Sequence, residues 1–70
     1  ASMQQTVDLL SQALAAMPTL RRQVFVLLRM EGKSRSDIAA LLQISEDAVS
    51  KHVSRALADI QRLIDQSRVV

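Results

Sequence analysis

The sequence contains no cysteine and a single histidine, His52, among its 70 residues. Without cysteine, disulfide bonds and thiolate chemistry are excluded, and one histidine cannot complete a zinc site of the usual Cys and His type. The chain has only one glycine and one proline, which excludes collagen-like, linker-like and low-complexity classes. We therefore expect one small folded domain that needs no metal or cofactor and depends on the packing of its apolar side chains, 49% of the sequence.

Aromatic side chains are almost absent, since Phe25 is the only one. Proteins that bind single strands or RNA commonly stack bases on aromatic rings, so a nucleic-acid partner of this chain is expected to be double-stranded. The longest apolar runs, such as residues 24–28, are far shorter than the roughly 20 residues that cross a bilayer, and no leader pattern opens the chain. These features predict a cytoplasmic protein without membrane insertion.

The formal net charge of +2 conceals an uneven distribution. Residues 21–35 hold five basic side chains and one acidic one, whereas residues 36–50 hold three acidic side chains and no basic one. Arginine outnumbers lysine seven to two, and the guanidinium fork suits phosphate and carboxylate groups. The pattern favours an acidic or nucleic-acid partner, although an ordinary solvated face also explains it.

The spacing of apolar residues predicts an all-α domain of four helices. The first helix is expected from Thr6, a candidate N-cap, to Ala16, because a residue that precedes proline is forced out of the helical region. Pro18 suits the first turn of a second helix, which is predicted to run to about Met30 and to end at Gly32.

Two further helices are predicted downstream. Ser34 is the N-cap of a short third helix of about two turns, with Asp37 three residues on as in a capping box. After a turn at residues 43–44, Ser45 is the N-cap of a fourth helix that is expected to extend to about Gln66.

The residues expected to form the core recur at spacings of three and four, as the apolar side of a helix does. They are Val7, Leu10, Leu14 and Met17; Leu20, Val24, Leu27 and Leu28; Ile38, Ala39, Leu41 and Leu42; and Val49, Val53, Ala56, Leu57, Ile60 and Ile64. Residues 1–5 show no such pattern, so we expect a disordered N-terminus or a cloning remnant there and a domain of residues 6–70.

The very short link between the third and fourth predicted helices is the most informative feature of the chain. The small Ala39, the apolar Ile44 in the turn, the cap before the fourth helix and the apolar Val49 predict two helices that cross closely and steeply. This arrangement is a helix-turn-helix. The outer face of its second helix is polar and basic, which suits groove edges and phosphates. That face consists of Glu46, Asp47, Ser50, Lys51, Ser54 and Arg55.

The candidate DNA-binding residues are Ser34, Arg35, Ser50, Lys51, His52, Ser54 and Arg55. Lys51 and the two serines beside it are assigned to base edges, and Arg55 with Arg35 to phosphates, from their order along the helices. The first amides of the third helix suit a phosphate, and His52 suits a surface or phosphate position. The two acidic residues at the start of the fourth helix are better explained by their favourable interaction with the helix dipole than by contact with bases.

The second predicted helix has more apolar residues than one face needs, seven of eleven between residues 20 and 30. Phe25, Val26 and Met30 do not all fit its main stripe, and a helix that is apolar on several sides is buried on several sides. We therefore predict that these three residues contact a partner protein. The alternative is that the first helix and the end of the fourth cover them. Arg21 and the other arginines of this helix are expected to form ion pairs or partner contacts.

Several short motifs follow one another along the chain: Met17-Pro18, Arg22 with Val24-Phe25, Gly32-Lys33-Ser34, Asp37-Ile38-Ala39, Ile44-Ser45, Val49 and Arg55-Ala56-Leu57. In this order they resemble region four of an extracytoplasmic-function sigma factor, particularly of the iron-starvation subgroup. The resemblance covers residues 13–60. One departure is Gln43, which stands where the family usually has glycine in the turn. If the backbone there needs a positive φ, the side chain costs about 1 kcal/mol.

The resemblance implies a domain that recognises the minus-thirty-five promoter element of double-stranded DNA in the major groove. It also implies that the domain docks on the flap of the RNA polymerase beta subunit and is sequestered by an anti-sigma protein.

Two alternatives from other classes remain open. The DNA-binding output domain of a two-component response regulator shares the four-helix pattern, although Met17-Pro18 and Arg55-Ala56-Leu57 argue against it. In a protein-binding helical adaptor the polar outer face would be merely solvated. An enzyme is not expected, because the chain has no cysteine, one histidine, no Gly-rich phosphate loop and no paired carboxylates that the pattern places in a core.

Overall fold

The computed structural model describes the backbone of residues 3–67 and the side chains of residues 7–66. Its elements are α1 (Met3–Ala16), α2 (Thr19–Phe25), the π-helical turn η1 (Val26–Met30) that continues α2, α3 (Arg35–Leu42) and α4 (Glu46–Ser67). No strand is present among these described residues. The predicted all-α class with four helices is therefore confirmed.

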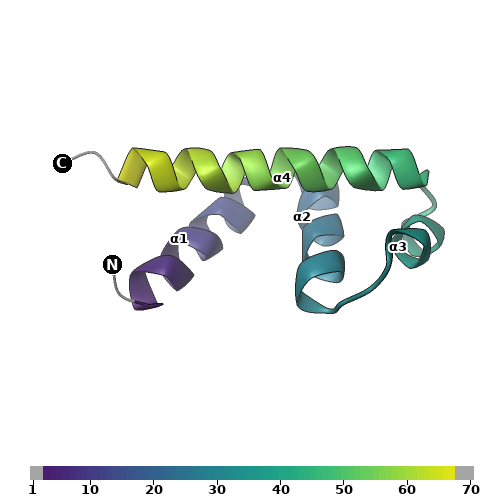
Figure 1. Ribbon diagram of the computed structural model, residues 1–70, viewed down its shortest axis with the longest axis horizontal. Coiled ribbons are helices and arrows are strands. Elements are labelled where there is room, and N and C mark those ends of the chain that lie inside the picture. The colour runs from purple at the N-terminus through teal and green to yellow at the C-terminus, as the bar shows by residue number, and fades with distance from the viewer. Residues whose placement is uncertain (1–2, 68–70) are drawn as a thin grey trace.

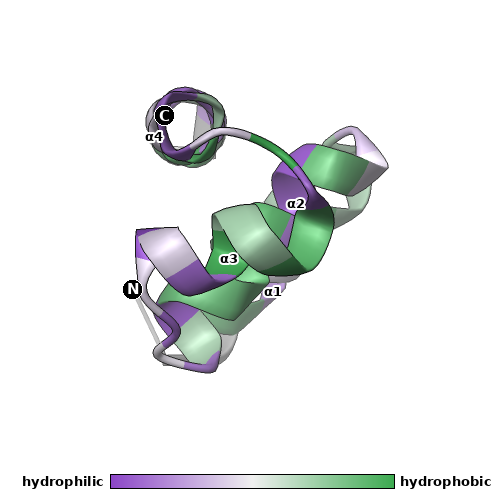
Figure 2. Ribbon diagram, turned by 90° about the vertical axis from the view of Figure 1, so that its right-hand side faces the viewer, coloured by the Kyte–Doolittle hydropathy of each residue, from purple (hydrophilic) through white to green (hydrophobic). Residues whose placement is uncertain are grey.

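The long helix α4 runs along the molecule, and the other helices pack on one side of it (Figure 1). A view along the axis of α4 shows α1, α2 and α3 together on that side (Figure 2). The molecule is accordingly elongated, with extents of 43 × 18 × 15 Å. Because its neighbours lie on one side only, α4 buries one face in the fold and presents the opposite face to solvent.

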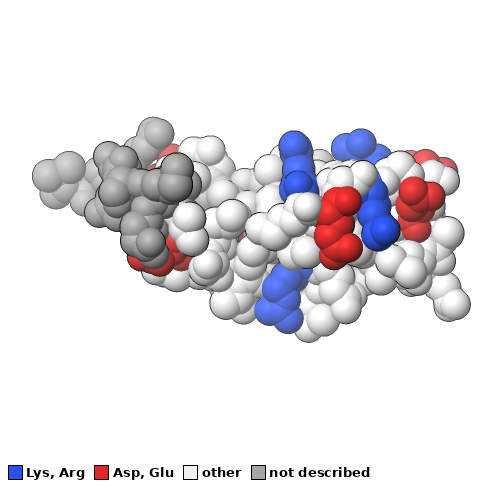
Figure 3. Space-filling model, turned by 90° about the horizontal axis from the view of Figure 1, so that it is seen from below, with Lys and Arg blue, Asp and Glu red and all other residues white. Residues whose placement is uncertain are grey.

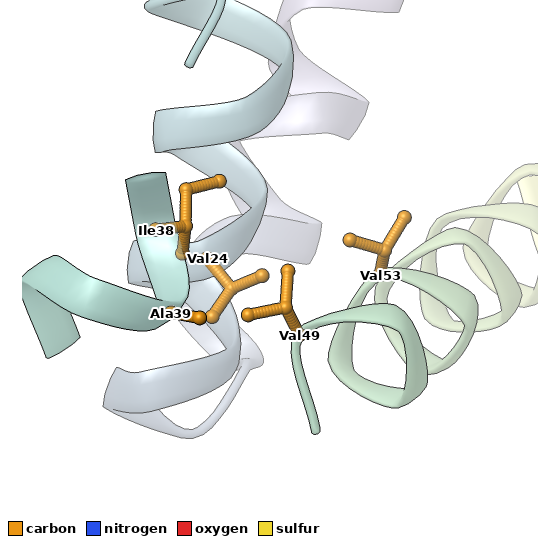
Figure 4. Packing of buried hydrophobic residues seen from close by; sticks show 5 residues of the cluster. All are labelled: Val24, Ile38, Ala39, Val49 and Val53. Carbon is orange, nitrogen blue, oxygen red and sulfur yellow. The ribbon is translucent and has the colours of Figure 1, made fainter. Parts of the chain in front are cut away.

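The first core cluster joins α2, α3 and α4. Val24, Ile38 and Val49 are completely buried in it, and Ala39 and Val53 complete the cluster (Figure 4). The side chain of Ala39 is a single methyl group, which allows α3 to approach its neighbours closely. Complete burial of a Val or Ile side chain contributes roughly 1.5–3 kcal/mol, so this cluster fixes how α3 and α4 cross.

The second core cluster joins α1, α2 and α4, and it consists of Ala13, Met17, Phe25 and Ala56. Phe25 directly follows Val24 of the first cluster, and successive residues of a helix are about 100° apart around its axis. The two side chains therefore enter different clusters. Since α2 lies between α1 and α3, it is buried on two sides (Figure 1).

Three residues of the predicted apolar stripes are exposed rather than buried, and these predictions are wrong: Val7, Leu41 and Leu57. Val7 belongs to the part of α1 that diverges from α4 (Figure 1). Leu57 is about 80° from Val49 around the axis of α4, at the edge of the buried face. Spacing alone identifies the apolar side of a helix, but the arrangement of its neighbours decides how much of that side is covered.

The start of the fold differs from the prediction. α1 begins at Met3, three residues before the expected N-cap Thr6. Residues 3–5 are therefore helical, and the start of the domain at residue 6 stays a prediction. Residues 1–2 and 68–70, to which the same domain prediction applies, lie outside the described residues.

The second helix reaches Met30 as predicted, but its last turn is π-helical. A bond of 3.1 Å from the Glu31 amide to the Val26 carbonyl closes this wider turn. Gly32 follows with a φ of 70°, which confirms the expected glycine cap at the end of the helix.

Candidate nucleic-acid interface

The turn between α3 and α4 has the backbone that the sequence predicts. Gln43 adopts the left-handed conformation, with φ 58° and ψ 45°, for which glycine is the usual residue. The amides of Gln43 and Ile44 both donate to the carbonyl of Ala39, and the Ile44 bond is 3.0 Å long. Backbone hydrogen bonds therefore hold α3 and α4 in a fixed relation across a turn of three residues.

Replacing Gln43 by glycine is expected to leave the free energy of unfolding unchanged or to raise it by up to about 1 kcal/mol, because a side chain at positive φ is strained. Gly32→Ala is the matched control, since its φ is 70° and an added Cβ meets no atom within 4 Å. That change adds only backbone strain and is expected to cost about 1 kcal/mol. Thermal unfolding followed by circular dichroism measures both. A clear loss of stability in Gln43→Gly would contradict the described turn.

Both helices of the helix-turn-helix begin at serine caps, as predicted. Ser34 Oγ accepts a hydrogen bond of 3.0 Å from the Asp37 amide, and Ser45 Oγ accepts one of 3.0 Å from the Ala48 amide. Each bond satisfies an amide that a helix start leaves unpaired. Since Ser34 and the following Arg35 are exposed, the start of α3 lies at the surface, where a phosphate can approach it.

The outer face of α4 combines basic and short polar side chains. Lys51, Ser54 and Arg55 are exposed, and Ser50 is half-buried beside them. Lys51 and Arg55 are four residues apart, about 6 Å along the axis, so they lie one turn apart on one side of the helix. Val49 points the other way, into the core. The structure thus brings four predicted DNA contacts together on one face.

His52 lies at the edge of that face, about 60° from Arg55 around the axis of α4. Its side chain is half-buried, and its Nδ1 atom is buried with no hydrogen-bond partner in the described part of the chain. The structure therefore places His52 at one edge of the exposed side of α4 and Ser50, which is also half-buried, at the other edge. Contact between His52 and a DNA phosphate stays a prediction.

The charge around the helix-turn-helix is balanced rather than strongly positive. Along α3 and the first three turns of α4, the exposed charged residues are Arg35, Lys51 and Arg55, which are basic, and Asp37, Glu46 and Asp47, which are acidic. On the face formed by α1, α2 and α3, basic and acidic side chains also alternate over the half that contains α2 and α3 (Figure 3). Non-specific attraction to DNA grows with the number of phosphates neutralised, so the charges around the helix-turn-helix give little attraction of this kind.

The residues predicted to contact a protein partner do not form one surface. Phe25 is only 6% exposed and belongs to the second core cluster, so the prediction that it contacts a partner is wrong. α1 and α4 supply the residues around it, which is the alternative that the sequence left open. Val26 is half-buried, and Met30 is 54% exposed at the end of η1.

The sequence did not predict a cluster of charges between α2 and α4. Asp59 of α4 pairs with Arg21 of α2 and with Arg62 one turn further along α4. The expected ion pairing of Arg21 is thereby confirmed. Arg21 and Asp59 are 38 residues apart, and no local pattern connects them. The ion pair of Asp59 with Arg62 could have been predicted from the sequence, because the two residues are three apart on one helix.

Neither a metal site nor a membrane span is found in residues 3–67. No group of three or more His, Cys, Asp or Glu residues there is placed to hold a metal ion. None of the described helices is both long and apolar enough to cross a membrane.

Comparison with known proteins gives one match. A family model described as "Sigma-70, region 4" matches residues 8–60, well over half of the chain. No curated protein and no solved structure matches. The matched span holds α2, η1, α3 and the part of α4 with the candidate DNA contacts.

Proposed function

The chain belongs to the sigma-70 region 4 family, and from this premise we propose that it recognises the minus-thirty-five promoter element through α4. Domains of this family are regulatory rather than enzymatic, and they bind promoter DNA and RNA polymerase. The main support is that the matched span contains a serine-capped helix-turn-helix whose second helix presents an uncovered polar and basic face.

In this proposal, α4 lies in the major groove, where a single helix fits and where its first turns contact base edges. Lys51 contacts bases, and the short side chains of Ser50 and Ser54 allow the helix to approach them closely. Arg55, one turn further, contacts a flanking phosphate, and Arg35 at the exposed start of α3 contacts another. The phosphate contacts set the register of the protein on the duplex, while Lys51 supplies sequence preference.

We also propose that the domain docks on the flap of the RNA polymerase beta subunit, that an anti-sigma protein controls it, and that it acts in the cytoplasm. The support is the resemblance of its motifs to extracytoplasmic-function sigma factors of the iron-starvation subgroup. Met30, exposed at the end of η1, is the residue of the predicted partner surface that is most available for such contacts.

The family match favours this function over the two alternatives. A response-regulator output domain shares the helix-turn-helix, but the match over residues 8–60 is to sigma region 4. If the chain were a protein-binding adaptor, the polar face of α4 would have no role beyond solubility. Mutation of that face tests this directly.

The experiment measures promoter binding by reconstituted holoenzyme on duplexes selected from a random pool. Lys51→Ala is expected to weaken binding to the preferred duplex by about 1–3 kcal/mol and to change the affinity for other duplexes little. Arg55→Ala is expected to weaken binding to all duplexes by the same factor. It is also expected to reduce the slope of log affinity against log salt concentration by about one unit. Arg62→Ala, which removes an exposed arginine of α4 about 16 Å beyond Lys51, is the control. Unchanged binding in both α4 variants at every salt concentration would favour the adaptor.

A further inference from the structure

The two acidic side chains in the first turn of α4, Glu46 and Asp47, lie on different sides of the helix although they are adjacent in the sequence. Val49 is completely buried and points into the core (Figure 4), so it marks the inner side of α4. At about 100° per residue, Asp47 is roughly 160° from Val49 around the axis, and Glu46 is only about 60° from it. Asp47 therefore lies on the outermost line of the exposed face, whereas Glu46 lies near the buried side.

Asp47 shares this outermost line with Lys51. Lys51 follows Val49 by two residues and Asp47 precedes it by two, so the two charged side chains are about 40° apart around the axis and about 6 Å apart along it. Both are exposed, and α1, α2 and α3 all pack on the opposite side of α4 (Figure 2). Among the described residues, the Asp47 carboxylate has no ion-pair or hydrogen-bond partner. A duplex that contacts Lys51 therefore also meets an unpaired carboxylate.

The helix dipole accounts for an acidic residue in this turn but not for its position on the outermost line. A carboxylate anywhere in the first turn interacts favourably with the dipole, and Glu46 already supplies one away from that line. In the major groove, a carboxylate on the outermost line loses water and faces phosphates of like charge. This costs free energy unless the carboxylate accepts a hydrogen bond from the DNA. The position of Asp47 therefore suits a base edge that offers a donor.

We propose that Asp47 is a specificity-determining residue, and that its carboxylate accepts a hydrogen bond from the N4 amino group of a cytosine in the major groove. The inference rests on the proposal that α4 lies in that groove. A carboxylate only accepts hydrogen bonds, and the major-groove edges of guanine and thymine carry acceptors but no donor. Adenine offers its N6 amino group beside the N7 acceptor, which repels a carboxylate, whereas cytosine offers its amino group with no acceptor beside it. Cytosine is therefore the preferred base.

Asp47 and Lys51 complement each other as readers of a base sequence. Lys51 donates hydrogen bonds, which suits the O6 and N7 acceptors of guanine. The separation of about 6 Å along α4 is less than two base-pair steps of about 3.4 Å, so the cytosine lies within about two base pairs of the base that Lys51 contacts. On a duplex without this cytosine, the carboxylate remains unpaired and repels the DNA. Asp47 thus contributes to selectivity by opposing the wrong sequences as well as by binding the right one.

Asp47→Asn tests the proposal, with Glu46→Gln as the matched control. Each change removes one carboxylate from the first turn of α4 and preserves the size of the side chain, so both lose the same kind of interaction with the helix dipole. Holoenzyme reconstituted with each variant selects duplexes from a random pool. Asp47→Asn is expected to bind the duplex selected by the unchanged chain about tenfold more weakly. It is expected to select adenine in place of the cytosine, because an asparagine amide bonds both N6 and N7 of adenine. Glu46→Gln is expected to select the same bases as the unchanged chain.

A role of Asp47 in charge alone gives a different result. Both variants would then bind every duplex more tightly and select unchanged bases, which overturns the proposal. Absence of a cytosine within about two base pairs of the position that depends on Lys51 overturns it as well. Lys51→Ala in the same selection separates the two possible failures. If Lys51→Ala alters the selected bases and Asp47→Asn does not, only the inference about Asp47 is wrong, whereas unchanged selection by both variants contradicts DNA recognition by α4.

Discussion

Phe25→Ala is expected to lower the free energy of unfolding by about 3–5 kcal/mol, as truncation of a buried aromatic side chain usually does. The ring of Phe25 is 6% exposed and packs with Met17 and Ala56, which belong to different segments of the chain. Removal of the ring leaves a cavity. The helices α1, α2 and α4 cannot close it without losing other packing contacts. A small domain has only about 5–15 kcal/mol of stability, so urea denaturation should show a large loss.

Met30→Ala is the matched control, because Met30 is 54% exposed on the turn that directly continues α2. It is expected to change stability by less than about 0.5 kcal/mol, as exposed substitutions usually do. The pair separates a core role from a partner role. If Phe25→Ala were as stable as Met30→Ala, the ring would lie at the surface. That result would support a role for Phe25 in contact with a partner protein.

The sequence predicted the boundaries of most helices because the signals that set them are local. Ser34 and Ser45 accept the amides expected of N-caps, and Gly32 has the positive φ expected of a helix end. A cap bonds to an amide three residues away, so its chemistry can be inferred from a short stretch of sequence. The polar face of α4 was predictable for a similar reason, since placing Val49 in the core determines which side of the helix faces outward.

Features that depend on how helices pack against each other were not predictable in this way. Phe25 and Met30 are both apolar residues outside the main stripe, yet α1 and α4 cover the first and leave the second exposed. His52 is adjacent to Lys51, but its ring is half-buried and Lys51 is exposed. The pairing of Asp59 with Arg21 joins residues 38 positions apart. In each case the deciding neighbour lies on another helix, and periodicity within one helix contains no information about it.

Ile38→Ala is expected to cost about 2–5 kcal/mol, because Ile38 is completely buried where α2, α3 and α4 meet. Leu41→Ala is a close control on the same helix, since Leu41 is 60% exposed and its truncation opens no cavity. Alanine favours the helix at both positions, so helix propensity does not explain a difference between them. Urea denaturation is expected to show a lower midpoint for Ile38→Ala and nearly no change for Leu41→Ala.

The same pair of variants connects the core to DNA recognition. Ile38 and Val49 pack in one cluster, so the cavity left by Ile38→Ala loosens the crossing of α3 and α4 that positions Lys51 relative to Arg35. At a temperature where circular dichroism still shows the helices formed, Ile38→Ala is expected to lose preference for the selected duplex, because base contacts need a defined helix position. Leu41→Ala is expected to keep that preference. Equal stability and equal sequence preference in the two variants would show that this cluster does not set the geometry of the helix-turn-helix.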